Sequence, residues 1–342
     1  MKLDFSVGIG RNLRINEIGE HARVAEQYGF SHVTFVDQQN LNPDVYVMMT
    51  LASMATHRIK IGQGVTQPYT YHPSVTANAT ASIDALSGGR AFLGIGAGGN
   101  AVRSMGLKAS PMTDFRECIK FIKQYIKGEE AEYKGTVMHS EWVRRPFPIY
   151  VASAGPRSLQ IAGELGDGVV FPGSHPELVK WSLEQVEKGA LKVGRDPTKI
   201  DTWVRTLVFV AESKEAARRE SASYAANVTR MYSMLTGENE DIIDLRQRID
   251  KKLPGIIDEF KLVHDVWDEY EHEKTEASHA KAVTDRVIDF RLITGTPDDV
   301  IERIYELGEL GVKNISTVMF PIVDKKGMMR EISDKIMTHF RN

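Results

Sequence analysis

The sequence predicts a (β/α)8 TIM barrel, and three observations support that prediction. Short apolar runs alternate with amphipathic stretches along most of the chain, which is the order of parallel βα units. Eight of those runs qualify as strands, and no shift in composition marks a boundary, so residues 1–342 are predicted to form a single domain. A typical barrel needs about 250 residues, which leaves room for insertions. A doubly wound sheet is the alternative.

The individual elements follow from apolar periodicity. In residues 18–28, for example, apolar side chains recur at helical spacing until Gly29 ends the helix. The predicted strands are residues 5–9, 33–36, 59–61, 91–95, 148–152, 168–171, 202–210 and 314–319. The predicted helices are residues 18–28, 45–55, 75–86, 112–127, 156–165, 177–188, 215–234 and 297–310.

Residues 237–287 predict a helical insertion, because charged residues dominate there and apolar residues recur at helical spacing. An insertion that follows the carboxyl end of a barrel strand lies on the active-site face. It is therefore either a lid or a peripheral pair of helices that only stabilises the fold.

Charge and cysteine content restrict the class of partner. Lys and Arg total 43 against 46 Asp and Glu, and a net charge of −3 is too balanced for an electrostatic hold on nucleic acid or an anionic membrane. The single cysteine, Cys118, excludes internal disulfides and is predicted to be a core residue. No stretch resembles a signal peptide or a membrane span. We expect a cytoplasmic protein with a small-molecule partner.

Polar and small residues gather where strands two and three end. Asp37 and Gln38 follow strand two, where barrel enzymes place catalytic groups, and Asp37 either contacts a ligand or caps the next turn. Gly62 and Gly64 fall inside the pattern of strand three. Glycines in a strand indicate a bulge or the close approach of a flat group such as a planar ring.

The ends of strands four and five suggest a cofactor. The Gly-x-Gly spacing up to Gly98 resembles a dinucleotide-binding motif only weakly. That motif requires glycines that open a helix, and the next predicted helix begins only near Met112. We therefore expect these glycines to form a backbone surface that borders a cofactor. Strand five leads through Ala154 and Gly155 to Pro156 at the first helical position. Free amides at the positive end of that helix predict a phosphate site, and an ordinary tight connection is the alternative.

Other chemistry finds little support. His264, His272 and His279 would share one face of a continuous helix, but a spacing of eight residues separates ligands by about 12 Å, so we predict a solvated face and no zinc site. No Gly-x-Ser-x-Gly elbow or matched Cys and His pair is present. A cofactor that brings its own reactivity is therefore expected.

Several segments resemble the luciferase-like superfamily of flavin and deazaflavin barrels, above all its methylenetetrahydromethanopterin reductase branch. They are residues 62–69 (GQGVTQPY), 84–90 (DALSGGR), 149–156, 162–168, 295–297 and 307–312. The resemblance spans residues 5–318 and is weakest over 225–290. It implies bound FMN or coenzyme F420, with the ring against the ends of strands two to four and the phosphate at residues 154–158. It also implies a non-prolyl cis peptide at Gly64–Val65 or its neighbour, and a homodimer.

The sequence departs from that family in two places. The deazaflavin enzymes commonly carry an Asp-His pair at the end of strand two, whereas here Asp37 precedes Gln38, which cannot deliver a proton. The acidic neighbours at the ends of strands one and four are replaced by Ile9-Gly10 and Gly98-Gly99-Asn100. Asp37 and Gln38 are thus the remaining catalytic candidates, and the proton donor stays open.

The resemblance implies an oxidoreductase that transfers a hydride to or from a small organic substrate. The alternatives are an FMN-dependent monooxygenase fed by a separate flavin reductase, and a noncatalytic flavin-binding barrel. No metal ligands are predicted. The candidate cofactor-binding residues are Asp37, Gln38, Gly64, Val65, Thr66, Gln67, Gly98, Asn100, Ala154, Gly155, Pro156, Arg157 and Ser158.

Overall fold

The computed structural model describes residues 1–9, 13–268, 271, 277–319 and 322–341. The side chains of Asn100 and Arg230 are not described. Gly10 and His272, both considered above, lie outside the described residues.

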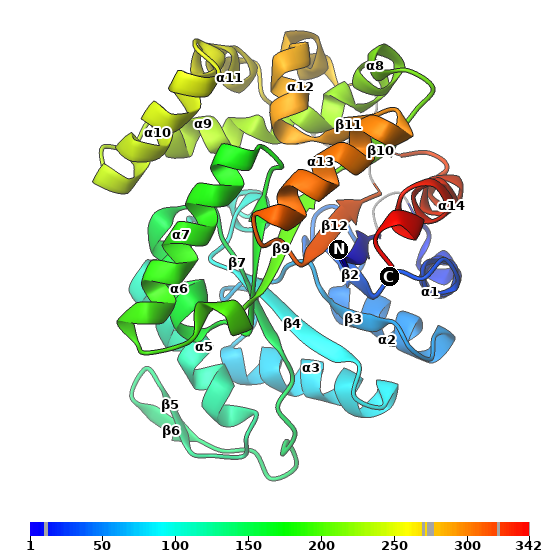
Figure 1. The fold of residues 1–342 in the computed structure, drawn as a ribbon. Coiled ribbons are helices and arrows are strands. Elements are labelled where there is room, and N and C mark those ends of the chain that lie inside the picture. Colours follow the sequence, from blue (N-terminus) through cyan, green and yellow to red (C-terminus); the bar gives the residue numbers. More distant parts are fainter. Residues whose placement is uncertain (10–12, 269–270, 272–276, 320–321, 342) are drawn as a thin grey trace.

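Eight parallel strands close into a barrel in the order β1-β2-β3-β4-β7-β8-β9-β12, and β12 pairs with β1 (Figure 1). Their bounds are β1 (Asp4–Gly8), β2 (His32–Phe35), β3 (Lys60–Gln63), β4 (Ala91–Gly96), β7 (Ile149–Ala152), β8 (Gly168–Pro172), β9 (Asp201–Thr206) and β12 (Asn314–Val318). Each corresponds to a predicted strand. The predicted TIM barrel is confirmed, and the doubly wound alternative is wrong.

Helices cover the outside of the barrel. They are α1 (Ile18–Gln27), α2 (Val45–Ala55), α3 (Pro73–Ser87), α4 (Asn100–Arg103), α5 (Met112–Tyr125), α6 (Pro156–Leu165), α7 (Pro176–Lys192), α13 (Pro297–Glu309) and α14 (Lys325–Lys335). Local chemistry fixes several starts: Asp44 accepts the N–H groups of Tyr46 and Val47 at α2, and Thr296 caps α13. The sequence analysis missed α4, α14 and the hairpin of β5 (Ala131–Tyr133) and β6 (Thr136–Met138).

The predicted strand 202–210 is two strands, because its partner changes. β9 pairs with β12 as far as Thr206, and then the N–H of Val208 donates to the side-chain oxygen of Thr317 at 3.0 Å. From there β10 (Val208–Val210) pairs with β11 (Ile293–Gly295) instead. The chain thus leaves the barrel at this point and enters the insertion.

The insertion is helical, as predicted. It contains α10 (Glu240–Lys252), α11 (Ile256–Asp265) and α12 (Asp285–Arg291), preceded by α8 (Lys214–Ala225) and α9 (Thr229–Leu235). A 3-10 turn, Ala226–Val228, separates α8 from α9, so the single helix predicted over 215–234 is wrong. These helices gather beyond β10 and β11 (Figure 1), which places them past the carboxyl end of β9.

Side chains fill the two sides of the barrel wall differently. Outward-facing residues such as Phe5, Val33 and Ile61 join one large core with the helices, and this core includes Cys118 at 0% exposure, as predicted. Burial raises the pKa of the Cys118 thiol to about 12. Inside the barrel, a separate cluster of Phe92, Tyr150, Val170 and Trp203 fills the interior.

Candidate functional site

The predicted site residues lie on one arc of the barrel rim. Asp37 follows β2, Thr66 follows β3, Gly98 follows β4 and Gly155 follows β7, and these four strands are consecutive neighbours in the barrel. The N–H of Thr66 donates to the carbonyl of Gly94, and its carbonyl accepts the N–H of Gly96, both at 2.9 Å. The structure therefore brings together the four segments that the sequence singled out.

Asp37 is a buried carboxylate at this rim, with 3% of its surface exposed. It accepts hydrogen bonds from the Thr66 hydroxyl at 2.5 Å and from the side-chain amide of Gln39 at 2.8 Å. Burial raises the pKa of Asp37, and the Thr66 hydrogen bond opposes this only in part. Because Asp44 caps the following helix and the partners of Asp37 are side chains, the capping alternative for Asp37 is wrong.

The two glutamines of the predicted site are both buried. The side chain of Gln67 serves its own loop, since it donates to the Thr70 hydroxyl and accepts the N–H groups of Tyr69 and Thr70. The carbonyl of Gln38 accepts two N–H groups, from Leu41 and Asn42, each at 3.0 Å. Gln67 can therefore offer a ligand its backbone, but its side-chain oxygen and nitrogen are already engaged.

The peptide bond Gly64–Val65 is cis, which confirms the expectation drawn from the resemblance. Gly64 has no room for a side chain, because a Cβ atom there would lie 2.6 Å from the Cβ of Thr34. The Val65 methyl groups lie 3.2 and 3.3 Å from the positions that Cβ atoms on Gly94 and Gly96 would occupy. Val65 and these glycines thus form an apolar surface of the kind that a flat ring requires.

Arg205 of β9 is a site residue that the sequence analysis missed. Its side chain crosses the barrel interior, donates to the Thr34 hydroxyl at 3.3 Å, and lies 3.1 Å from the Cβ position of Gly8. A positive charge is therefore present inside the barrel, beside Gly64. The alternation of Trp203 and Arg205 along one strand, which puts both side chains on the same face, could have indicated it.

The amino end of α6 has the form of an anion site. Gly155 is the N-cap residue, so no side chain caps the helix, and a Cβ atom built there meets nothing within 4 Å. Pro156 occupies the first turn, as predicted, and the Ser158 hydroxyl turns back to the Gly155 carbonyl at 2.9 Å. The first-turn N–H groups of this ten-residue helix thus face open space beside Gly155. Ala154 is half-buried and Arg157 is exposed there.

The end of β4 differs from the prediction in one respect. Helix α4 starts at Asn100, directly after the glycines, whereas the sequence predicted no helix before Met112. Gly98 has φ +108°, and a Cβ atom there would lie 2.9 Å from Val102 in that helix. A four-residue helix is too short to be the helix of a dinucleotide-binding βαβ unit. The structure therefore gives no support to a dinucleotide site at the end of β4.

The predicted solvated histidine face is wrong. Helix α11 ends at Asp265, so His279 lies in a separate 3-10 turn, where it is 1% exposed and stacks on Trp267 at 4.7 Å. His264 is exposed and contacts the Thr229 hydroxyl. Within the described residues no group of His, Cys, Asp and Glu could hold a metal ion. None of the described helices has the length and apolarity of a membrane span.

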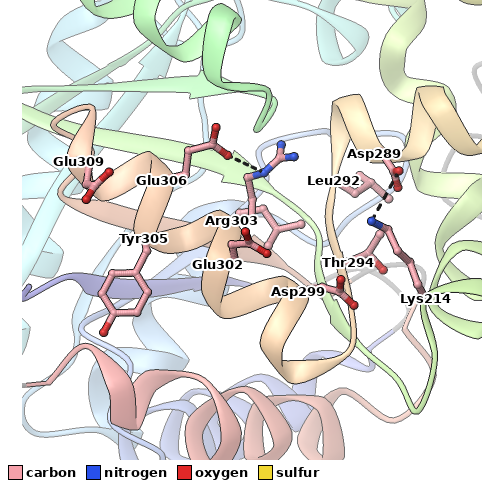
Figure 2. Close-up of a pocket in the computed structure, with 11 residues that line it drawn as sticks. Lys214, Asp289, Leu292, Thr294, Asp299, Glu302, Arg303, Tyr305, Glu306 and Glu309 are labelled. Atoms are coloured by element: carbon pink, nitrogen blue, oxygen red, sulfur yellow. Dashed lines mark ion pairs between the residues drawn. The ribbon is translucent and has the colours of Figure 1, made fainter.

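A cavity of about 550 Å³ lies beside α13, away from the predicted site (Figure 2). Two bases line it, Lys214 and Arg303, and each is paired with an acid, Asp289 and Glu306 respectively. Three further carboxylates, those of Asp299, Glu302 and Glu309, also line it. This excess of negative charge would repel an anionic cofactor, so the cavity does not compete with the barrel rim for that role.

Comparison with known proteins gives one consistent result. The family model described as luciferase-like monooxygenase matches residues 3–314. The chain is 31% identical to a 5,10-methylenetetrahydromethanopterin reductase of Archaeoglobus fulgidus, covering 98% of this chain and 99% of the relative. It is 34% identical to the reductase of that name from Methanolobus tindarius, covering 87% and 89%. The fold is similar to the coenzyme F420 dependent tetrahydromethanopterin reductase of Methanopyrus kandleri, with a TM-score of 0.79, 26% identity, and 99% and 100% coverage.

Proposed function

This chain belongs to the luciferase-like monooxygenase family, and from that premise we propose that it is an oxidoreductase that transfers a hydride between coenzyme F420 or FMN and a small organic substrate. The observation that supports this most is the arrangement of the rim. A buried carboxylate, an apolar surface over glycines and an uncapped helix start follow consecutive strands of one barrel. A cofactor with a flat ring and an anionic tail needs these three features side by side.

The residues present fit such a cofactor. Val65 and the neighbouring glycines would support the ring, Asp37 and Thr66 would meet its polar edge, and the N–H groups at the start of α6 would hold its phosphate. The cofactor supplies the hydride chemistry when it is bound. The barrel would orient the cofactor and the substrate and exclude water from them, and both effects raise the reaction rate.

Asp37 is the rim group best suited to hold a proton. Its raised pKa, caused by burial, keeps the carboxyl protonated to a higher pH than an ordinary aspartate. Gln38 offers hydrogen bonds but no titratable proton. We therefore propose that Asp37 binds the polar edge of the cofactor ring. Gln38, which is also buried, would help to orient that ring through hydrogen bonds.

F420 is the preferred cofactor, because the structurally similar reductase from Methanopyrus kandleri is dependent on that coenzyme. An FMN-dependent monooxygenase is the second candidate. The observation that favours it is the presence of Gln38, which cannot deliver a proton, where the deazaflavin enzymes commonly carry a histidine.

Titration with both cofactors tests the proposal. Purified protein should quench the fluorescence of F420 or FMN, and the absence of binding to either would refute an enzyme of this class. Bound, reduced cofactor is then mixed anaerobically with candidate carbonyl or imine substrates, and hydride exchange is followed by absorbance. Oxygen consumption that requires an organic substrate would instead establish the monooxygenase.

The homodimer, the separate flavin reductase and the cytoplasmic location are proposals that rest on the resemblance and on the sequence. Light scattering on the purified chain would test the first of them. A monomer at micromolar concentration would refute it.

A further inference from the structure

Arg205 is a half-buried arginine inside the barrel, one residue before the end of β9. Side chains alternate between the two faces of a strand, so Arg205 shares its face with Trp203, which belongs to the cluster that fills the interior. Arg205 therefore lies one layer nearer the barrel mouth than that cluster. Because a guanidinium does not lose its proton in a protein, the barrel holds a permanent positive charge at this level.

Two glycines leave the space that the guanidinium occupies. A Cβ atom on Gly8 of β1 would lie 3.1 Å from Nη2 of Arg205, and a Cβ atom on Gly64, which follows β3, would lie 2.9 Å from Nη1. Nη1 also donates to the hydroxyl of Thr34 on β2, at 3.3 Å. The side chain thus reaches from β9 across the interior to three consecutive strands on the other side of β12.

The guanidinium lies directly beside the surface proposed for the cofactor ring. Gly64 precedes Val65, whose methyl groups and neighbouring glycines form that surface, and Val65 is half-buried like Arg205. Only the backbone at Gly64 separates Nη1 from Val65. A unit charge acts over roughly 10 Å in salt solution, and over a longer range where water is excluded. The charge of Arg205 can therefore act on a ring that rests on Val65.

The charges inside the barrel are separated along its axis. The carboxylate of Asp201, four residues before Arg205 on the same strand face and so about 13 Å away along the strand, accepts hydrogen bonds from Tyr150 and Trp203. Burial lowers the pKa of His32 to about 3, so this interior ring is neutral at pH 7. Negative charge thus lies toward the amino ends of the strands and positive charge toward the mouth, an arrangement that favours an anion at the mouth.

Hydride transfer creates such an anion on the ring. A C–H bond of the substrate breaks, and the hydrogen moves to the oxidised ring with both electrons of that bond. The substrate is oxidised, the ring is reduced, and the ring becomes more negative by one unit; the reverse step removes that charge. Fixed positive charge beside the place where negative charge develops is an effective form of electrostatic stabilisation. Burial disfavours the negative charge of Asp37 at the rim, since it raises the pKa of that carboxyl.

We infer that Arg205 is an electrostatic site for the reduced cofactor ring, because its guanidinium stabilises the negative charge that the ring gains with the hydride. The reduction potential of the bound cofactor is then higher than it would be without this charge. The inference rests on the proposed function, since it requires a flavin or deazaflavin ring on the Val65 surface. It assigns to Arg205 a contribution that Asp37 and Gln38 cannot make, because neither carries positive charge.

The wild-type protein provides the first test. F420 and FMN are titrated into it, and whichever binds is reduced anaerobically in the presence of a reference dye of known potential. We expect the potential of the bound cofactor to exceed that of the free cofactor, because the reduced form binds more tightly than the oxidised form. A potential equal to or below the free value would overturn the inference. Absence of binding by both cofactors would instead refute the proposed function, and the inference would fall with it.

Substitution of Arg205 tests whether its charge is the cause. Arg205→Met removes the charge and keeps most of the aliphatic stem. The affinity for the reduced form should fall at least about tenfold more than that for the oxidised form, which lowers the potential of a two-electron couple by about 30 mV. Arg205→Lys is the matched control, because it keeps the charge but not the planar group. Its potential should stay closer to that of the wild-type protein than to that of Arg205→Met.

Every outcome of these measurements decides the inference. An unchanged potential in Arg205→Met would overturn it, and so would an equal shift in Arg205→Lys and Arg205→Met. A purely structural role for Arg205 predicts a lower melting temperature and an equal loss of affinity for both forms, with no change in potential. If Arg205→Met does not fold, Arg205→Gln replaces it, since glutamine retains a donor for Thr34. If neither variant folds, the wild-type potential decides.

Discussion

Substitution of Gly155 by Asp should stabilise the protein and weaken cofactor binding at the same time. Gly155 is the uncapped N-cap of α6, its φ of −88° and ψ of 160° suit any residue, and a Cβ atom meets nothing within 4 Å. An Asp carboxylate there accepts first-turn N–H groups and interacts favourably with the helix dipole. Together these effects amount to about 0.5–1.5 kcal/mol of added stability in the cofactor-free protein.

The same carboxylate occupies the position proposed for the phosphate. Two unit charges about 4 Å apart repel by about 4 kcal/mol at an effective dielectric constant of 20, which corresponds to a loss of affinity of roughly a thousandfold. Fluorescence quenching of FMN and F420 measures the affinity, and thermal unfolding without cofactor measures the stability. Gly155→Ser is the matched control, because it caps α6 without adding charge and should lose far less affinity. Unchanged cofactor affinity in Gly155→Asp would refute the placement of the phosphate.

Three further predictions concern stability. Gly64→Ala should cost about 1–3 kcal/mol in urea unfolding, because its Cβ would lie 2.6 Å from the Cβ of Thr34, and an unchanged midpoint would contradict the close packing. Asp37→Asn should be more stable than the wild-type protein at pH 7, since burial raises the pKa of Asp37 and therefore opposes its ionisation. The stability of the wild-type protein relative to this variant should fall as the pH rises above 3.8, the ordinary pKa of aspartate. A difference in stability that does not change with pH would contradict the raised pKa. Burial opposes ionisation of Glu26, but the N–H groups of residues 57–59 outweigh it and lower the pKa of Glu26, so its contribution to stability is present above pH 4.5 and is lost as the pH falls. Glu26→Gln should therefore flatten the acid limb of a thermal unfolding series, and an unaltered limb would show that this carboxylate is not the cause.

The eight barrel strands could be predicted because parallel strands are buried on both faces and appear in a sequence as short apolar runs. The runs at residues 33–36 and 168–171 are clear examples, and the structure has strands at both. Elements that depend on a distant partner could not be predicted in this way. The change of partner after Thr206, which divides one apolar run into β9 and β10, depends on β11 more than 80 residues later.

The same division holds for the candidate site. The order of the rim segments after β2, β3, β4 and β7 follows from the barrel alone, because the carboxyl ends of its strands meet at one face. Alternation along β9 places Arg205 on the same face as Trp203, but only the structure shows that this face turns into the barrel. The burial of Arg291 was equally out of reach, since it depends on partners far along the chain, such as Gly173.

The barrel, the helical insertion and the rim segments after four neighbouring strands can all be predicted from the amino-acid sequence. Each of these follows from local periodicity and from the rule that the carboxyl ends of barrel strands meet at one face. Which polar groups are buried, and which of them lack a partner, becomes known only from the folded structure. Burial and pairing depend on residues brought together from distant parts of the chain. The hydroxyl of Thr66 reaches Asp37, while Arg291 comes to lie against Gly173, where no carboxylate of the described residues contributes to its electrostatic environment.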